Sequence, residues 1–133
     1  MKRYFVLLML ILFVLSGCNR QANFSERCKR EAEQQNKRLC PREVDKGVML
    51  DSIKFREDSL MFEYYYTMED SLYPQEGIQK YKNDIRENLR KKIVNSIEMK
   101  RYKENGVAFN YIYLYRNTRE KALEYMFTKA DYK

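Results

Sequence analysis

The middle of the sequence carries a helical pattern that limits the folds open to this chain. Six apolar side chains follow one another at steps of three or four residues: Ile78, Tyr81, Ile85, Leu89, Ile93 and Ile97. This spacing places them on one face of an α-helix. Pro74 suits the start of such a helix, and Asn105-Gly106 suits its end. We predict one long amphipathic helix, whose residues Ile85, Leu89 and Ile93 are buried against a sheet.

Strand patterns lie on both sides of this helix. Residues 48–55 and 60–67 are rich in apolar and aromatic side chains and flank a polar tetrapeptide, which predicts a hairpin. Residues 107–116 alternate strictly, and residues 122–129 follow after a turn at Asn117-Thr118. We therefore predict four strands in two hairpins, joined by the central helix.

A second helix is predicted before the first strand. Residues 24–39 carry a thin apolar stripe that Pro41 ends, because the residue before a proline is pushed out of helical geometry. The order of elements is then α-β-β-α-β-β. This order predicts an α+β fold with two helices packed on a four-stranded, mostly antiparallel sheet. If both helices share one face, the other face is open to a partner.

Two cysteines test the first helix. Cys28 and Cys40 are separated by twelve positions, which is about 18 Å along a continuous helix at 1.5 Å per residue. A disulfide tolerates no more than about 7 Å between Cα atoms. Helix and disulfide therefore exclude each other, and we favour the helix because periodicity and stop signal agree.

Tyrosines crowd the predicted third strand. Tyr111, Tyr113 and Tyr115 share one face, and Ile112 and Leu114 share the other. The rings can form a partner-binding face, or they can pack under the long helix as core. Aliphatic side chains interdigitate readily with a helix, whereas a buried tyrosine hydroxyl without a partner costs roughly 1–3 kcal/mol. We therefore predict that these tyrosines lie away from the helix, partly exposed to a partner.

The charge of the chain is basic, with a formal net charge of +7. The polar face of the long helix contains Arg86, Arg90 and Lys91, which would suit contact with an anionic surface such as a membrane. A solvated face with no ligand is the simpler alternative. We expect no nucleic-acid partner, because the N-terminal segment described below predicts export.

Catalysis is not expected. The sequence has no histidine, so the usual general base near neutral pH and histidine-bearing zinc sites are excluded. The four glycines stand apart and form no phosphate-binding loop. We expect no cofactor and no metal, and the sequence identifies neither a small-molecule substrate nor a catalytic residue. A hydrolase that uses paired Asp and Glu carboxylates is the remaining enzymatic alternative.

The N-terminus has the three parts of a secretory signal peptide. Lys2 and Arg3 precede twelve apolar or aromatic residues, the last of which is the first residue of Leu15-Ser16-Gly17-Cys18. The tetrapeptide resembles the lipobox of bacterial lipoproteins, which implies cleavage before Cys18 and lipidation of its sulfur. We expect residues 1–17 to be the signal peptide, residues 18–23 a tether and residues 24–133 a single small domain. The protein would be anchored to the inner or the outer membrane of a bacterial envelope.

A wider resemblance covers most of the remaining chain. It rests on Asn36-Lys37-Arg38-Leu39-Cys40-Pro41, Leu50-Asp51-Ser52, Tyr64-Tyr65-Tyr66, Gly106-Val107-Ala108-Phe109 and Tyr111-Ile112-Tyr113. These segments are similar to small exported proteins of Bacteroidetes that have no assigned function, and the resemblance implies no catalytic residue. The hypothesis from the sequence is a lipid-anchored, non-enzymatic binding or assembly module with an envelope protein as its partner.

Overall fold

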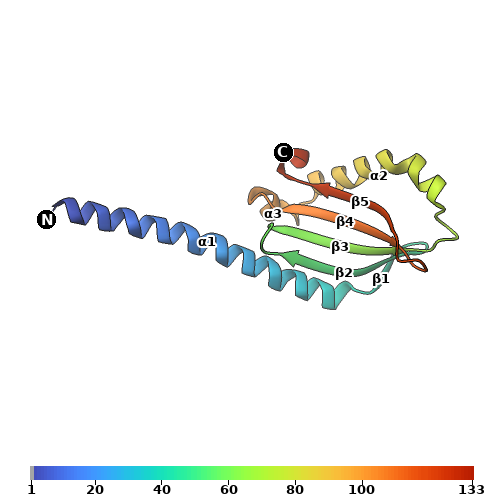
Figure 1. The fold of residues 1–133 in the computed structure, drawn as a ribbon, viewed down its shortest axis with the longest axis horizontal. Helices are drawn as coiled ribbons and strands as arrows, with labels where there is room; N and C mark the ends of the chain where they lie inside the picture. The colour runs from blue at the N-terminus through green and yellow to red at the C-terminus, as the bar shows by residue number, and fades with distance from the viewer. Residues whose placement is uncertain (1) are drawn as a thin grey trace.

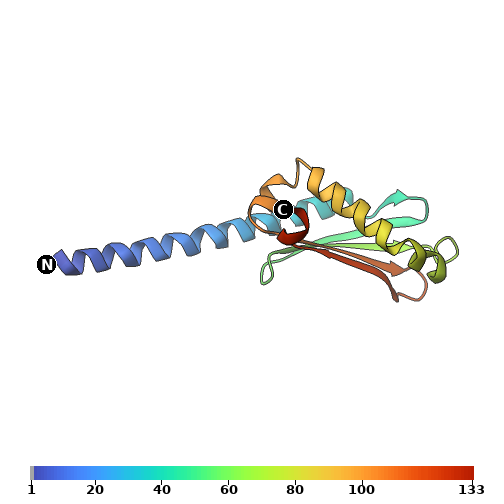
Figure 2. The same cartoon turned by 90° about the horizontal axis from the view of Figure 1, so that it is seen from above.

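The computed structural model describes the backbone of residues 2–133 and the side chains of residues 20–133. The helices are α1 (Lys2–Leu39), α2 (Gln75–Asn95), α3 (Lys100–Glu104) and α4 (Lys129–Tyr132). The C-terminal part of α1 and the whole of α2 lie on the same face of one sheet (Figure 1 and Figure 2). The N-terminal half of α1 extends away from the sheet.

Five strands form the sheet: β1 (Arg42–Asp45), β2 (Val48–Arg56), β3 (Met61–Met68), β4 (Ala108–Tyr115) and β5 (Lys121–Phe127). They follow the order of the chain, and every neighbouring pair is antiparallel except β3 and β4, which are parallel. The predicted α+β fold with a mostly antiparallel sheet is confirmed. The predicted number of four strands is wrong.

The strand that the sequence analysis missed is β1. Its four side chains, Arg42 to Asp45, are all exposed, so burial imposes no alternation on its sequence. The turn into β2 uses Gly47, whose φ of +71° favours glycine. A Cβ atom at this position would lie 2.7 Å from a side-chain carbon of Leu72. The glycine after Asp45-Lys46 was the one sequence signal for this hairpin.

The first helix is confirmed at its C-terminal end and is longer than predicted at its N-terminal end. The backbone of residues 18–23, for which we predict a tether, is helical and continuous with the rest of α1. Cys28 and Cys40 are both free, in agreement with the prediction that a continuous helix keeps them apart. None of the helices among the described residues is long and apolar enough to cross a membrane.

The predicted long helix is interrupted at Ser96. Its start and its end near Gly106 are as predicted, but residues 96–99 leave helical geometry and α3 begins at Lys100. Lys103 Nζ donates to the carbonyl oxygens of Ile93 and Val94 at 2.8 Å, which satisfies the end of α2. Because of the break Ile97 is 86% exposed, although its spacing continues the stripe.

Strand register determines which side chains form the core. The fully buried side chains include Phe62, Phe109 and Phe127, which lie side by side on the three strands β3, β4 and β5. The α1 helix packs along β2 through the buried residues Cys28 and Ala32. Asn36 Oδ1 also accepts a hydrogen bond from the backbone N–H of Ile53 at 2.8 Å. This contact ties the helix to a bulged part of β2.

Candidate functional site

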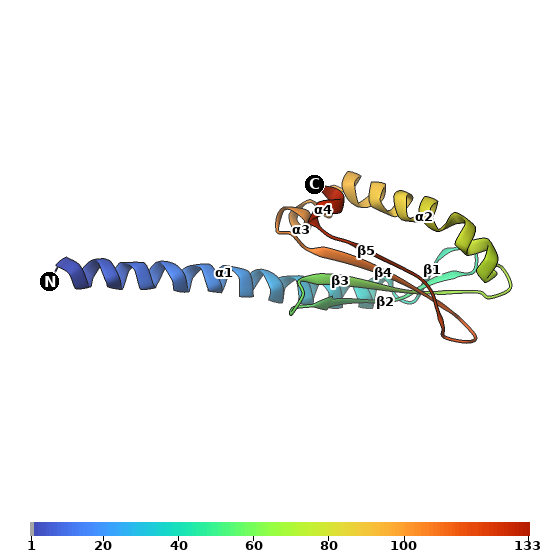
Figure 3. The same ribbon diagram turned by 45° about the horizontal axis from the view of Figure 1, so that its top comes forward.

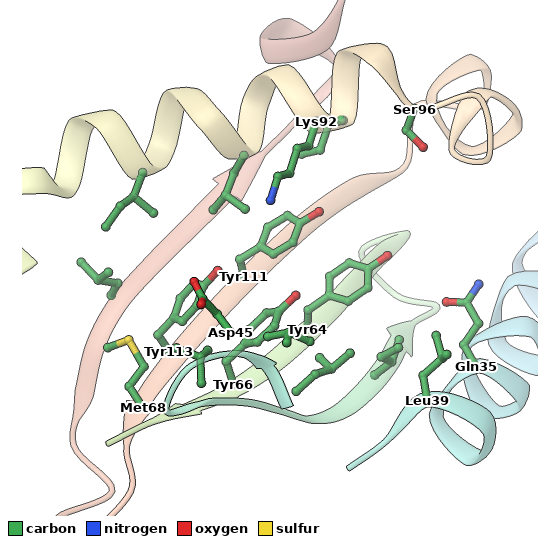
Figure 4. A pocket seen from close by; sticks show the side chains of 18 of the residues that line it. Gln35, Leu39, Asp45, Tyr64, Tyr66, Met68, Lys92, Ser96, Tyr111 and Tyr113 are labelled. Atoms are coloured by element: carbon green, nitrogen blue, oxygen red, sulfur yellow. The ribbon is translucent and has the colours of Figure 1, made fainter. Parts of the chain in front are cut away.

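A groove of about 720 Å³ runs between α1 and α2 over the middle of the sheet (Figure 4). Tyrosines of β3 and β4 form its floor, and the side chains of the two helices form its walls. Floor and walls are Tyr64, Tyr66, Tyr111 and Tyr113; Ile78, Ile85, Leu89 and Ile93 of α2; and Gln35, Arg38 and Leu39 of α1. Apolar walls around a few polar groups are typical of a binding site.

The groove exists because the two helices pack on strands that are far apart. The α1 helix packs along β2, and α2 lies against β5. Three strand spacings of about 4.8 Å separate these two strands, which amounts to roughly 14 Å. Helices in direct contact are about 8–10 Å apart. The arrangement therefore leaves β3 and β4 without a helix directly above them (Figure 3).

The parallel register of β3 and β4 stacks the floor tyrosines in pairs. Tyr64 lies beside Tyr111 with ring centroids 4.9 Å apart, and Tyr66 lies beside Tyr113 at 4.6 Å. The planes within these pairs differ by only 14° and 12°. The rings therefore cover one another's faces, and their hydroxyl groups point into the groove (Figure 4).

The predicted orientation of the third-strand tyrosines is wrong. Tyr111, Tyr113 and Tyr115 lie on the helix side of the sheet, with Tyr111 and Tyr115 buried and Tyr113 half-buried. The hydroxyls would be buried against the helix only if α2 packed directly on this strand. Because α2 lies over β5 instead, the Tyr111 and Tyr113 hydroxyls reach a groove. Tyr115 does not line the groove, and its hydroxyl is buried without a hydrogen-bond partner among the described residues.

Burial perturbs the floor tyrosines strongly. Loss of solvation raises the pKa values of Tyr64, Tyr66, Tyr111 and Tyr113 far above the ordinary value, and the neighbouring tyrosines raise them further. Among the described side chains, none forms a hydrogen bond with any of these four hydroxyls. They remain neutral donors at physiological pH.

The α2 wall is less buried than predicted. Ile93 is fully buried as expected, but Ile85 and Leu89 pack only partly against the core and are half-buried, because they also line the groove. Lys92 extends from the same helix toward the tyrosines (Figure 4). The periodicity of the sequence identifies the inward face of this helix but not the distance that separates it from the sheet.

The basic residues proposed for anionic-surface contact mostly have partners within the protein. Arg86 Nη2 pairs with Asp131 at 3.0 Å, and its guanidinium lies over the ring of Phe127. Arg90 pairs with Glu87 at 2.7 Å. Lys91 is exposed. Arg86 thus connects α2 to α4, whereas Arg90 pairs within α2, and the positive charge of both arginines is already compensated.

The opposite face of the sheet is covered by none of the helices in the described part of the chain (Figure 2), and it mixes polar side chains with apolar ones such as Ile112 and Met126. Glu63, which is 7% exposed, accepts a hydrogen bond from Tyr65 at 2.7 Å and pairs with Arg56. Asn110 donates to Glu124 at 3.0 Å, and Lys121 pairs with the same carboxylate. These contacts pair most of the polar groups on this face, although Asn110 Oδ1 is buried without a hydrogen-bond partner among the described residues.

The carboxyl groups do not resemble those of a hydrolase. Burial would raise the pKa of Glu31, but hydrogen bonds from Tyr102 and Arg101 outweigh it and lower the pKa. The pKa values of Asp58, Glu87 and Glu124 are lowered mainly by hydrogen bonds from basic side chains. A general acid needs a raised pKa. The lowered pKa values of these four carboxyl groups are the opposite of that requirement.

The raised pKa values of the floor tyrosines predict sensitivity to alkali. Above pH 10, tyrosines of the unfolded chain lose their protons, whereas Tyr64 and Tyr111 of the folded protein keep theirs. The free energy of unfolding therefore falls as the pH rises through this range. Thermal melts from pH 8 to 11 should show a smaller fall in Tm for Tyr64→Phe/Tyr111→Phe than for the wild type.

Tyr81→Phe is the control for this measurement, because Tyr81 of α2 is 53% exposed. Its melts should follow the wild-type profile. If the double variant loses Tm with pH as steeply as the wild type, the two buried hydroxyls are not the source of the alkaline sensitivity.

Known structures share this fold at low sequence identity. A candidate secreted protein from Pseudomonas aeruginosa superposes with a TM-score of 0.73 at 11% identity, over 85% of this chain and 96% of that protein. A type II secretion system pilotin from Vibrio vulnificus gives 0.64 at 10% identity, over 86% and 96%. The pilotin AspS from Vibrio cholerae gives 0.61 at 10% identity, over 87% and 98%.

Comparison of the sequence with protein families identifies the family of this chain. No curated protein matches the chain at a significant level. The family described as "Domain of unknown function (DUF8479)" matches residues 23–123, which span the C-terminal half of α1 and most of the sheet. The chain is a member of this family.

Proposed function

We propose that the protein is a non-enzymatic binding or assembly module of the bacterial cell envelope. Its binding site is the groove between α1 and α2, and the occupant is a segment of an envelope protein. The observation that carries the proposal is the groove itself, which combines aliphatic walls with polar groups on its floor. The site replaces the open sheet face of the sequence hypothesis.

The construction of the groove supports a binding role. Ile85 and Leu89 keep part of their apolar surface uncovered although they stand over the sheet. Covering that surface would gain about 25 cal/mol for each Å² removed from water. The helices are held apart by separate strands, so the groove is formed before a partner arrives. A site that is already formed lowers the cost of binding.

The fold of the neighbours supports a place in the envelope. Two of the proteins that share the fold are pilotins of type II secretion systems, and a third is a candidate secreted protein. A role in the assembly of an envelope complex would agree with these neighbours. The resemblance to exported Bacteroidetes proteins suggests a source among these bacteria.

The proposal includes a lipid anchor at Cys18, which the lipobox-like tetrapeptide Leu15-Ser16-Gly17-Cys18 supports. More than one acyl chain at this residue would hold the protein at a membrane, whereas a single chain anchors only marginally. Cys18→Ala should abolish labelling by a fatty-acid probe in growing cells and remove the protein from the lipid-anchored fraction. Cys28→Ala is the matched control and should keep the label.

Two outcomes would contradict the anchor. One is a wild-type protein that carries no label. The other is a Cys18→Ala variant that is labelled and retained at the membrane like the wild type.

The groove is tested by a substitution that fills it. Leu89→Arg places a long charged side chain against the floor at a half-buried position, so the fold should persist while the groove is blocked. Tagged full-length Leu89→Arg protein is extracted from native envelopes in detergent. The amount of envelope partner that co-purifies with it should be at least tenfold lower than with the wild type. Mass spectrometry measures the loss, and circular dichroism checks the fold.

Met126→Arg is the matched control, because Met126 is 49% exposed on the opposite face of the sheet. It should retain the partner at the wild-type level. Loss of the partner in Met126→Arg, with full retention in Leu89→Arg, would move the binding site to the other face.

A further inference from the structure

We infer that the four floor tyrosines select the segment that enters the groove, through hydrogen bonds from their hydroxyls to acceptors on that segment. The inference rests on the proposed function and specifies the chemistry of its partner. The occupant is a protein segment that carries aliphatic side chains toward α2 and hydrogen-bond acceptors, carboxylates among them, toward the floor.

The hydroxyls of the floor differ from those of most other tyrosines in the protein. Tyr73, Tyr125 and Tyr132 each donate to a backbone carbonyl within the protein, at 2.6, 2.9 and 2.7 Å. Tyr65 and Tyr102 each donate to a glutamate. The fold thus supplies acceptors to these five hydroxyls and, among the described residues, supplies none to the floor.

Burial makes this difference significant. Tyr64 is only 9% exposed and Tyr111 only 7%. Their rings stabilise the core, and phenylalanine would supply the same rings without polar groups in a poorly solvated position. The hydroxyls are therefore not required by the packing of the sheet. Their use is in what they present to the groove.

The arrangement of the hydroxyls is regular. Because the rings are nearly parallel, their hydroxyl groups are spaced in the groove about as far apart as the strands that carry them. Centroids of neighbouring rings are 4.9 and 4.6 Å apart across the strands, and those of Tyr66 and Tyr111 are 6.4 Å apart diagonally. Positions two apart along a strand repeat at about 6.6 Å. Side chains four apart on a helix repeat at about 6 Å, so a peptide can match these rows either as a helix or in extended form.

Basic and acidic side chains both line the groove. The Lys92 side chain reaches from α2 toward the tyrosines (Figure 4), and Arg38 lines the same groove. Asp45 also lines the groove, and its carboxylate accepts from the N–H of Lys46 at 2.7 Å. Glu98 is exposed, as Lys92 and Arg38 are, but in Figure 4 the Lys92 amine extends toward the hydroxyls. Four hydroxyl donors with a lysine beside them match carboxylate or carbonyl oxygens.

Two other classes of occupant fit less well. A sugar would stack on the open face of an aromatic ring, but each of these rings has one face against its partner at 4.6–4.9 Å and points its hydroxyl end into the groove (Figure 4). A lipid chain has no acceptor along its length, so it would leave the hydroxyls unpaired and would carry a desolvation cost. A peptide supplies both aliphatic side chains and repeated acceptors.

The test is selection from a phage-displayed library of random 16-residue peptides on full-length protein in detergent, followed by affinity measurements on the synthetic peptides. Peptides that bind the wild type and fail to bind Leu89→Arg are groove binders. They should combine aliphatic residues with Asp, Glu, Asn or Gln. Each should bind Tyr66→Phe/Tyr113→Phe about tenfold more weakly than the wild type, a loss equal to about 1.4 kcal/mol.

Two controls separate hydrogen bonding from folding and from charge. The Tm of the double phenylalanine variant should equal or exceed that of the wild type, because only hydroxyls without protein partners are removed. Peptides that carry a carboxylate should lose affinity for Lys92→Met, and neutral peptides should not.

The outcomes distinguish this inference from the proposed function. If groove binders bind the phenylalanine variant as tightly as the wild type, the groove function stands and selection by the hydroxyls is wrong. If no selected peptide distinguishes the wild type from Leu89→Arg, the groove is not a peptide site, and the inference fails with it.

Discussion

The parallel pairing of β3 with β4 is the constraint on which the rest of the structure depends. It places Tyr64 beside Tyr111 and Tyr66 beside Tyr113, so that two short tyrosine patterns far apart in the sequence become one floor. The pairing requires a crossover connection, and α2 with α3 supplies it. The crossover brings α2 over β5, and this position opens the space above the floor.

The α1 wall of the groove is held in place by polar contacts as well as by packing. Asn36 ties α1 to the backbone of β2, and Glu31 accepts hydrogen bonds from Arg101 and Tyr102 of α3. These bonds hold α1, α3 and the sheet together at one end of the groove. A groove whose walls are held from both sides keeps its width, which suits a site that selects its partner.

The sequence predicted the elements well where one face is buried. Residues 48–55 and 107–116 alternate because the sheet has a core side, and the α2 stripe follows for the same reason. It failed where burial leaves no pattern, as in the exposed strand β1. It also joined α2 to α3, because Ile97 keeps helical spacing after Ser96 has ended the helix.

The candidate site depends on distances that periodicity does not contain. The pattern of Tyr111 and Tyr113 shows that they share a face, but it does not show how far from that face the helix lies. If α2 lay directly above β4, it would bury these hydroxyls. Because α2 lies over β5 instead, the hydroxyls face a groove. Leu39 and Gln35 of α1 also line the groove. The sequence pattern of α1 predicts a helix, but it does not predict where that helix lies on the sheet.

The most direct measurement of the central claim is photo-crosslinking in living cells, with benzoylphenylalanine at Ile85 in one strain and at Met126 in another. Ile85 lines the groove, and Met126 lies on the opposite face of the sheet. The groove account predicts that Ile85 forms an adduct with one segment of an envelope protein and that Met126 does not. An adduct with that partner from Met126, and none from Ile85, would contradict it.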